Sequence, residues 1–393
     1  MEKIEKQRQT VNIAVIGSGF MGKEHTKAYN LAKISCPQIA ATPVLKILCD
    51  ADEPKVKERA YLWGYEEYCT DYHEILERDD IDIVDICTTA ITHADMCIDF
   101  IKANKFFICC EKPLVTLYED GLRLMEVYRE YKPRTAVGFN KRRWPAVTYA
   151  RQLVKEGVLG DIVMYNGRYC QGGLAARLAA TVPFYRSLAR SGGFADSGSH
   201  AIDMARFILD DEYESVVARA YPLCPEIPSR APLPGEDPND VPKIKPDSED
   251  FALIIGQMKS GLTCSIYQTG VYNGSGEDIS YEVHGTKGTV RWSGANPSLV
   301  QLCTYGGDRA STAFKDILMG PAHPYGDCVP FLPGFGVGVS DNMSFQAYEV
   351  INAFVSGKEY DPNFEDAWDI VRVCEAARRS ERERRWIDIK DVL

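Results

Sequence analysis

The stretch Val11-Asn-Ile-Ala-Val-Ile-Gly-Ser-Gly-Phe-Met-Gly22 decides the fold. It begins as an apolar, β-branched run that stops at glycine, which predicts a buried parallel strand, and a helix is predicted to begin near Met21. In the G-x-G-x-x-G spacing, Gly17 permits a tight turn, Gly19 lets the backbone approach a pyrophosphate, and Gly22 lets helix and strand pack closely. The stretch therefore predicts the opening of a dinucleotide-binding Rossmann fold; an ordinary strand-to-helix turn is the alternative.

The same rhythm continues along the first 140 residues. Short apolar runs that predict buried strands alternate with segments of helical composition. The strands are predicted at 11–16, 44–49, 81–87, 106–110 and 135–138, and the helices at 21–32, 54–62, 71–77, 94–103 and 114–131. This alternation predicts βαβ units and an α/β domain with a doubly wound parallel sheet.

After residue 140 the pattern changes to runs of strands with few long helices between them. Strands are predicted at 163–169, 251–258, 262–268, 279–284 and 289–292, helices at 199–209 and 345–354, and a long Pro- and Asp-rich loop at 222–247. Such a pattern favours an α+β domain with an open, mostly antiparallel sheet. We therefore expect a Rossmann domain over residues 1–140 and a substrate-binding and oligomerisation domain over residues 141–393.

The amino-acid composition indicates which kinds of partner the protein is expected to bind and in which compartment it is expected to lie. The chain has 393 residues, with 45 basic against 56 acidic residues and a net charge of −11. An acidic chain is a poor nucleic-acid binder, and no apolar stretch approaches the roughly 20 residues of a membrane span. The thirteen cysteines lack the C-x-x-C spacing of metal sites and sit mostly in apolar runs, which favours reduced thiols, no bound metal and a cytoplasmic protein.

Asp50 supplies the second part of the dinucleotide fingerprint. It stands at the end of the second predicted strand, where a carboxylate accepts hydrogen bonds from the adenosine ribose hydroxyls. A carboxylate there also repels a 2′-phosphate, so NAD is favoured over NADP. Lys55 and Lys57 lie close in sequence and leave NADP as the alternative.

Several further motifs follow the glycine turn and Asp50 in a fixed order: Ile86-Cys-Thr-Thr-Ala-Ile-Thr-His93, Glu111-Lys-Pro113 and the segment 191–203, Ser-Gly-Gly-Phe-Ala-Asp-Ser-Gly-Ser-His-Ala-Ile-Asp. This ordered set resembles the glucose–fructose oxidoreductase / inositol dehydrogenase / rhizopine catabolism (Gfo/Idh/MocA) family. The resemblance covers nearly the whole chain, including 285–289 and 364–366. It implies NAD(P) on the Rossmann domain and a substrate site on the open sheet, in a branch acting on cyclitols, anhydrosugars or glycosides.

The resemblance also implies the catalytic residues. Lys112 matches the family lysine that hydrogen-bonds the reacting hydroxyl, His200 the proton-transfer histidine, and Asp196 the carboxylate that accompanies it. The chemistry is reasonable in its own right, because a histidine titrates near neutrality and an ammonium stabilises a developing alkoxide. Asp196 and His200 are four residues apart and would share one helix face. A solvated lysine, a packed histidine and a helix N-cap are the alternatives.

The candidate cofactor contacts extend beyond the glycines. Around NAD we expect Gly17, Gly19, Phe20, Met21, Gly22, Asp50, Thr88, His93, Glu111 and Lys112. The chain departs from the family at Thr88-Thr-Ala90, where Thr-Pro-Asn is usual, and the missing asparagine removes one cofactor contact. His93 matches a frequent family histidine, and its alternative is a residue that simply begins the next helix.

Substrate contacts are expected from loops rich in polar and aromatic groups, because a hydroxyl-rich ligand needs donors, acceptors and some aromatic surface. The candidates are Lys112, Arg142, Tyr169, Gln171, Tyr185, Arg186, Asp196 and His200. For Arg186 the alternative is an ordinary surface charge.

Together these features predict an NAD-dependent oxidoreductase that oxidises a ring hydroxyl of a sugar, cyclitol or glycoside, with carbon 3 of a glucoside as one version. Two alternatives remain open: a glycoside-cleaving enzyme that uses bound NAD for transient oxidation and elimination, and a non-enzymatic NAD-binding sugar sensor. The presence of both Lys112 and His200 argues against the sensor. An uncovered sheet face also predicts a homo-oligomer.

Overall fold

The computed structural model describes residues 9–392, apart from 173–193, 224–225, 230–232, 234, 247–248, 275 and 330–331. The chain divides into two compact units, and each is described by itself. The first combines the chain up to Val115 with Glu119–Arg143 and Tyr325–Trp368; the second combines Thr116–Tyr118, Trp144–Pro324 and Asp369–Leu393. The first unit thus includes 325–368, which the division at residue 140 assigned to the second domain.

A six-stranded parallel sheet forms the centre of the first unit. Its strand order is β3-β2-β1-β4-β5-β6, so the chain starts in the middle and winds outward twice. The bounds are β1 Thr10–Ile16, β2 Thr42–Cys49, β3 Glu67–Cys69, β4 Ile83–Ile86, β5 Phe107–Cys110 and β6 Thr135–Val137. The prediction of a doubly wound parallel sheet is therefore confirmed.

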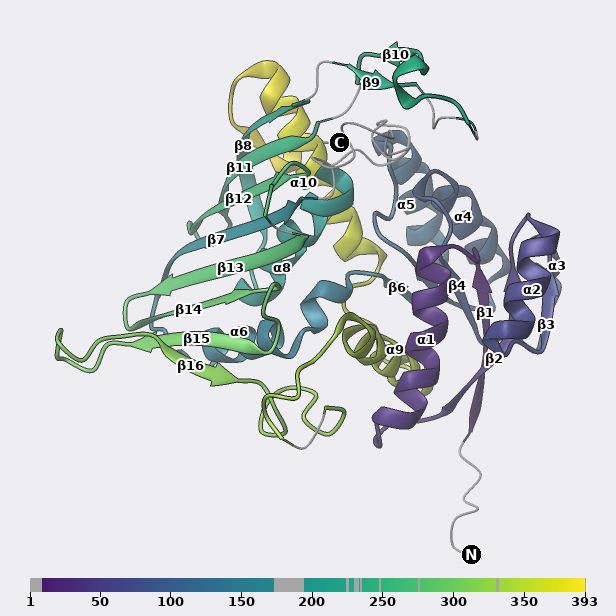
Figure 1. Ribbon diagram of the computed structural model, residues 1–393, viewed down its shortest axis with the longest axis horizontal. Coiled ribbons are helices and arrows are strands. Elements are labelled where there is room, and N and C mark those ends of the chain that lie inside the picture. Colours follow the sequence, from purple (N-terminus) through teal and green to yellow (C-terminus); the bar gives the residue numbers. More distant parts are fainter. Residues whose placement is uncertain are drawn as a thin grey trace, which may run out of the picture. The chain divides into compact units, whose positions relative to one another are not determined.

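Helices pack on this sheet, and the C-terminal part of the chain supplies α9 (Val339–Ser356) and the beginning of α10 (Phe364–Glu383). The other helices are α1 Phe20–Ser35, α2 Glu53–Trp63, α3 His73–Leu76, α4 His93–Ala103 and α5 Tyr118–Tyr131. Helix α9 lies beside α1 (Figure 1), and its Met343, Val350 and Ile351 belong to the same buried cluster as Val15 of β1. This packing is why 325–368 joins the first unit.

The second unit is built on a nine-stranded sheet. Its order is β16-β15-β14-β13-β7-β12-β11-β8-β17, and every neighbouring pair is antiparallel except β7 with β12. The bounds are β7 Ile162–Gln171, β8 Tyr213–Tyr221, β11 Phe251–Met258, β12 Thr263–Thr269, β13 Glu277–Gly285, β14 Gly288–Ser293, β15 Leu299–Thr304, β16 Lys315–Leu318 and β17 Ile387–Asp388. The open, mostly antiparallel sheet is as predicted.

Helices α6 Pro145–Lys155 and α8 Ser199–Leu209 pack against one face of this sheet. The hydroxyl of Tyr281 on β13 donates to the Ala146 carbonyl of α6 at 2.9 Å, which identifies the helix-covered face. The predicted loop at 222–247 contains, among its described residues, the short strands β9 Ile227–Pro228 and β10 Lys243–Ile244. None of the helices in the described parts of the chain has the length and apolarity of a membrane span.

Candidate active site

The glycine turn joins β1 to α1 with the geometry that a dinucleotide phosphate needs. Gly17 has φ +102°, and its N–H donates to the Cys49 carbonyl at 2.8 Å. A Cβ on Gly22 would lie 1.8 Å from the Gly17 carbonyl oxygen, whereas one on Gly19 would meet nothing within 4 Å. The backbone at Gly19 is therefore open, and the first turn of α1 carries neither a side-chain cap nor an acidic residue. These residues fit a pyrophosphate at the helix N-terminus.

Asp50 is already integrated into the turn. Its Oδ2 accepts hydrogen bonds from the Ser18 N–H at 2.8 Å and the Ser18 hydroxyl at 2.6 Å, and it pairs with Lys55 Nζ at 2.9 Å. Burial alone would raise the pKa of Asp50, but the hydrogen bonds from Ser18 and Lys55 outweigh it and lower the pKa to about 2. The carboxylate is therefore ionised at neutral pH and rigidly placed beside the glycine turn.

The Glu111-Lys112-Pro113 turn follows β5 directly, and two buried histidines contact it. Glu111 Oε1 lies 2.9 Å from His25 Nε2, while its Oε2 accepts the Lys112 N–H at 3.1 Å. On the other side of Lys112, the Pro113 carbonyl lies 3.0 Å from His93 Nδ1. Burial lowers the pKa of His93, so this histidine is neutral and donates a single N–H.

In the second unit, His200 and Asp196 lie on consecutive turns of one helical segment. A π-helical turn, Phe194–Gly198, carries Asp196 and leads into α8, whose second residue is the buried His200. The His200 ring meets the Tyr169 ring of β7 edge-on, with the centroids 5.9 Å apart. The helical spacing of Asp196 and His200 is as predicted, and their chemical roles stay a prediction.

Tyr169 connects this histidine to a polar cluster on the strands. Its hydroxyl donates to Glu277 Oε1 of β13 at 2.7 Å and lies 3.5 Å from Gln171 Nε2, and Gln171 in turn contacts the Ser197 hydroxyl. Burial, with the nearby carboxylates of Glu277 and Asp196, raises the pKa of Tyr169 well above its usual value. The phenol thus stays a neutral hydrogen-bond donor.

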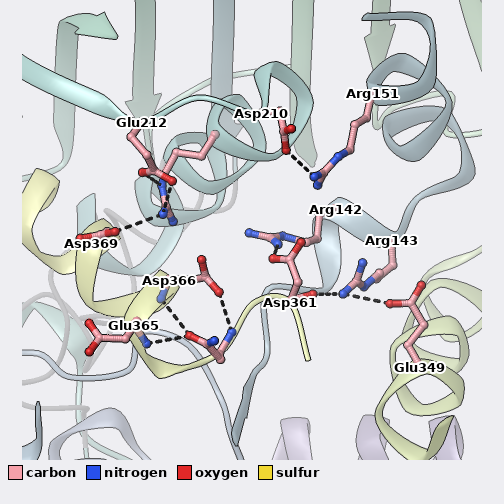
Figure 2. A network of polar contacts seen from close by, with 12 residues as sticks. Arg142, Arg143, Arg151, Asp210, Glu212, Glu349, Asp361, Glu365, Asp366 and Asp369 are labelled. Atoms are coloured by element: carbon pink, nitrogen blue, oxygen red, sulfur yellow. Dashed lines mark hydrogen bonds and ion pairs between the residues drawn. The ribbon is translucent and has the colours of Figure 1, made fainter. Parts of the chain in front are cut away.

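Arg142 lies in the first unit and is buried in an ion pair. Figure 2 shows its guanidinium beside the Asp361 carboxylate, and the neighbouring Arg143 bound to Glu349 at 2.9 Å. Only 3% of the Arg142 side chain is exposed, and Asp361 holds it in place. Its predicted role in the substrate site stays a prediction.

Two family models match the chain in sequence. One describes an oxidoreductase family with an NAD-binding Rossmann fold and matches residues 11–139; the other is the Gfo/Idh/MocA C-terminal domain and matches residues 147–291. The scyllo-inositol 2-dehydrogenase (NAD⁺) of Bacillus subtilis is 30% identical over 285 residues, which cover 71% of this chain and 73% of that protein. The chain belongs to the Gfo/Idh/MocA oxidoreductase family. It is an NAD-dependent oxidoreductase.

Full-length relatives of this Gfo/Idh/MocA protein include a levoglucosan dehydrogenase. The enzyme of Pseudarthrobacter phenanthrenivorans is 29% identical over 391 residues, covering 98% of this chain and 99% of that protein. A levoglucosan dehydrogenase structure with NADH superposes with a TM-score of 0.90 at 28% identity, covering 97% and 99% of the two chains. A complex with NADH and levoglucosan gives 0.89 at 29% identity, covering 97% and 100%. Dehydrogenase relatives of this kind do not favour the glycoside-cleaving and sensor alternatives.

Within each unit the structure brings predicted residues of this oxidoreductase together. In the first unit, the residues that follow β4 lie against the glycine turn. A Cβ on Gly17 would be only 2.7 Å from the Cys87 carbonyl oxygen and 3.0 Å from the Thr88 nitrogen. Phe20 and Met21 open α1 beside that turn. In the second unit the predicted substrate residues Tyr169, Gln171 and His200 lie together. Tyr185 and Arg186 lie outside the described residues.

Three participants escaped the sequence reasoning. Ser18 occupies a variable position of the glycine motif, and only the structure shows that it binds Asp50 through two hydrogen bonds. Glu277 follows a glycine-rich turn and gives no signal of its own. His25 lies nine residues past Ile16 on α1, where a histidine on a largely apolar face was the available clue.

Proposed function

We propose that this oxidoreductase removes hydrogen from a ring hydroxyl of an anhydrosugar, cyclitol or glycoside, and that the reacting position is carbon 3 of a glucoside-type ring. The likeness to levoglucosan dehydrogenase over both full lengths, and to inositol dehydrogenases over most of the chain, supports this substrate class. The observation that carries the proposal is the polar cluster in which the buried His200 meets Tyr169, tied to Glu277 and Gln171. Such a cluster supplies the donors, acceptors and aromatic surface that a polyol ring requires.

We assign the chemical roles as follows. NAD, when bound, accepts the hydride that leaves the ring carbon. Lys112 donates a hydrogen bond to the reacting oxygen and stabilises its negative charge, His200 takes the hydroxyl proton, and Asp196 orients the histidine. The products are the ketone, the reduced cofactor and one proton. Arg142, together with Tyr185 and Arg186, completes the proposed set of substrate residues.

The placement of the glycine turn supports the proposed cofactor contacts. The N-terminus of α1 is surrounded by Gly17, Gly19, Phe20, Met21 and Gly22. Asp50 lies beside it and would accept hydrogen bonds from the adenosine ribose. Thr88, His93 and Glu111 follow β4 and β5, at the carboxyl edge of the sheet where dinucleotides bind in doubly wound folds.

Isotope transfer tests the reacting carbon. The purified protein is incubated with NAD and levoglucosan, inositols or methyl glucosides, and the absorbance of reduced nicotinamide is followed. A substrate carrying deuterium at carbon 3 should transfer the label to the cofactor and yield an unlabelled ketone. Label retained in the product would place the reaction at another carbon. No cofactor reduction with any member of the panel would refute the substrate class.

Variants of the acid–base pair test the assigned roles. Lys112→Ala and His200→Ala should each lower kcat by on the order of 10²- to 10⁴-fold while NAD binds with nearly unchanged affinity. His73→Ala is the control, because this exposed histidine pairs with Asp71 on the surface of the first unit. Full activity of the Lys112 and His200 variants would overturn the assignment.

We further propose a cytoplasmic homo-oligomer formed through the sheet face opposite α6 and α8. This face has exposed Leu253 and Ile255 on β11 beside a hollow of about 590 Å³ whose lining includes Arg168 and Arg291. Twelve cysteines of the described residues are free of disulfides, which supports a reducing compartment. Light scattering should show a multimer that Ile255→Asp dissociates, and a monomeric wild-type protein would refute the interface. Recovery outside the cytoplasmic fraction would refute the location.

A further inference from the structure

A buried cluster of ionisable groups lies behind the Glu111-Lys112-Pro113 turn, in the first unit. His25, from the second turn of α1, is 4% exposed and contacts two carboxylates at once. Its Nδ1 lies 2.7 Å from Asp85 Oδ2 of β4, and its Nε2 lies 2.9 Å from Glu111 Oε1. The Tyr29 hydroxyl, one helical turn further along α1, donates to the same Asp85 oxygen at 2.8 Å.

The geometry favours a charged histidine. A neutral imidazole has one N–H, so one of the two carboxylates would face a nitrogen lone pair at hydrogen-bond distance; the imidazolium donates to both. Burial would lower the pKa of His25, but Asp85 together with Cys87 more than offsets it, and the pKa lies well above its usual value. The other titratable groups beside the cluster are Tyr29, Tyr65, Cys87 and Cys109. Burial raises the pKa of each.

His25, Asp85 and Cys87 also offer possible metal-ligand atoms that lie within 4.8 Å of one another. The direct contact of 2.7 Å between His25 and Asp85 is a hydrogen bond, however, and the second histidine nitrogen is occupied by Glu111. A hydrogen-bonded relay describes these atoms better than a metal centre does.

The relay ends at the backbone of Lys112. Glu111 uses one oxygen for His25 and the other for the Lys112 N–H at 3.1 Å. The carboxylate also packs directly on Gly138, where a Cβ would lie 2.2 Å from Glu111 Oε1. Glu111 is therefore held by its hydrogen bond to His25 and by its contact with Gly138. The histidine therefore fixes the residue that precedes Lys112.

We propose that His25 is a positioning residue for Lys112 and acts through Glu111, keeping the Glu111-Lys112-Pro113 turn in the one arrangement that aligns the ammonium with the reacting hydroxyl. The inference rests on the proposed role of Lys112. Asp85 and Tyr29 serve the same purpose one step further back, since they fix the ring plane and keep both imidazolium protons directed at carboxylates.

A double-mutant cycle on the full-length enzyme tests this. His25→Gln should lower kcat by on the order of 10- to 100-fold, because a shift of about 1 Å at a catalytic group costs that much, while substrate KM and the NAD dissociation constant stay within about twofold. In the Lys112→Ala background the same substitution should have almost no further effect. His73→Gln, at an exposed histidine paired with Asp71 on the surface, is the matched control and should leave kcat unchanged.

The outcomes distinguish a failure of the proposed function from a failure of the inference about His25. If Lys112→Ala alone retains full activity, the proposed function fails. If Lys112→Ala is impaired but the loss from His25→Gln is absent, or adds fully to it, His25 does not act through Lys112 and the inference is wrong. A rise in the NAD dissociation constant without a fall in kcat contradicts it too. Should His25→Gln not fold, Tyr29→Phe enters the same cycle, with a smaller loss that must again vanish without Lys112.

Discussion

Substituting alanine at two glycines of the cofactor turn should separate folding from cofactor binding. At Gly22 a Cβ would lie 1.8 Å from the Gly17 carbonyl oxygen, and ordinary contact begins at 3.4 Å. Because the clash is with backbone, no side chain can rotate away, and α1 must move by roughly 1.6 Å from β1 to restore that contact. Overpacking of this kind costs about 1–3 kcal/mol, and the better helix propensity of alanine returns at most about 1 kcal/mol.

The matched variant is Gly19→Ala. Gly19 has φ −74° and ψ −156°, which alanine adopts without strain, and its Cβ would meet no protein atom within 4 Å. We expect its free energy of unfolding to stay within about 0.5 kcal/mol of wild type. NAD affinity should nevertheless fall by on the order of 10- to 100-fold, because the methyl group occupies the space through which the backbone reaches the pyrophosphate and costs one charge-assisted hydrogen bond of about 1.5–3 kcal/mol.

Two measurements decide the matter: urea unfolding followed by circular dichroism, and NAD titration by calorimetry. Gly22→Ala should lower both stability, by about 1–2 kcal/mol, and affinity, while Gly19→Ala should lower affinity alone. Wild-type stability and affinity in Gly22→Ala would refute the close-packing argument. Equal destabilisation of the two variants would show that Gly19 is structural and that the open space above it has no role in binding.

The remaining predictions concern charge and hydrogen bonding. Asp50→Ser should weaken NAD by about tenfold and strengthen NADP, because Lys55, which pairs with Asp50 at 2.9 Å, becomes available to a 2′-phosphate; titrations that give an unchanged preference would contradict this. Tyr169→Phe should raise substrate KM about 2- to 10-fold by freeing Glu277 and leave NAD affinity unchanged, as steady-state kinetics and calorimetry can show. The pKa of His25 is raised in the folded protein, so its stabilising contribution is complete below the unfolded pKa of about 6.5 and is lost as pH rises through the folded value. The difference in unfolding free energy between wild type and His25→Asn should therefore shrink toward alkaline pH, whereas the lowered pKa of His93 predicts, for His93→Gln, a difference that shrinks toward acid. A difference of the opposite slope in urea titrations would show that the charge states are wrong.

The predictable part of the fold was the part encoded in short, contiguous patterns. Short apolar runs predicted β1, β2, β4 and β5, and the helical segment Ser199–Leu209 has the bounds that were predicted. Strands β8, β15 and β16 and the long helix α10 were not predicted. Helix α10 buries Ala367, Ile370 and Cys374 at helical spacing, but its second half is dense in charge, which obscured the pattern.

The candidate site also has a part that short sequence patterns predict and a part that they do not. Among residues that belong to local motifs, Gly17 and Asp50 could be named from their position in the pattern, and Lys112 from the resemblance of its motif to the family. Residues whose role depends on a contact across many positions could not: Glu277 meets Tyr169 over 108 residues, and His25 meets Glu111 over 86. No single-sequence signal reports such a pairing, because each partner is an unremarkable polar residue in its own segment. Glu111 shows the consequence, since the motif identified the residue and only the structure identified the group that holds it.

Helix α1 links the glycine turn to the contact between His25 and Glu111 in the first unit. This link explains why the first turn of the helix packs so closely on β1. Its N-terminus lies at the glycine turn, and three residues beyond Gly22 the same helix presents His25 to Glu111. The hydrogen bond between His25 and Glu111 is 2.9 Å long, so a displacement of α1 by more than an ångström would break it. The absence of a side chain at Gly22 therefore lets α1 lie close enough to β1 both to form the phosphate site and to place His25 beside Glu111. A substitution that loosens the phosphate site through α1 must also release the carboxylate that precedes Lys112, whereas Gly19→Ala, which leaves the helix in place, must not.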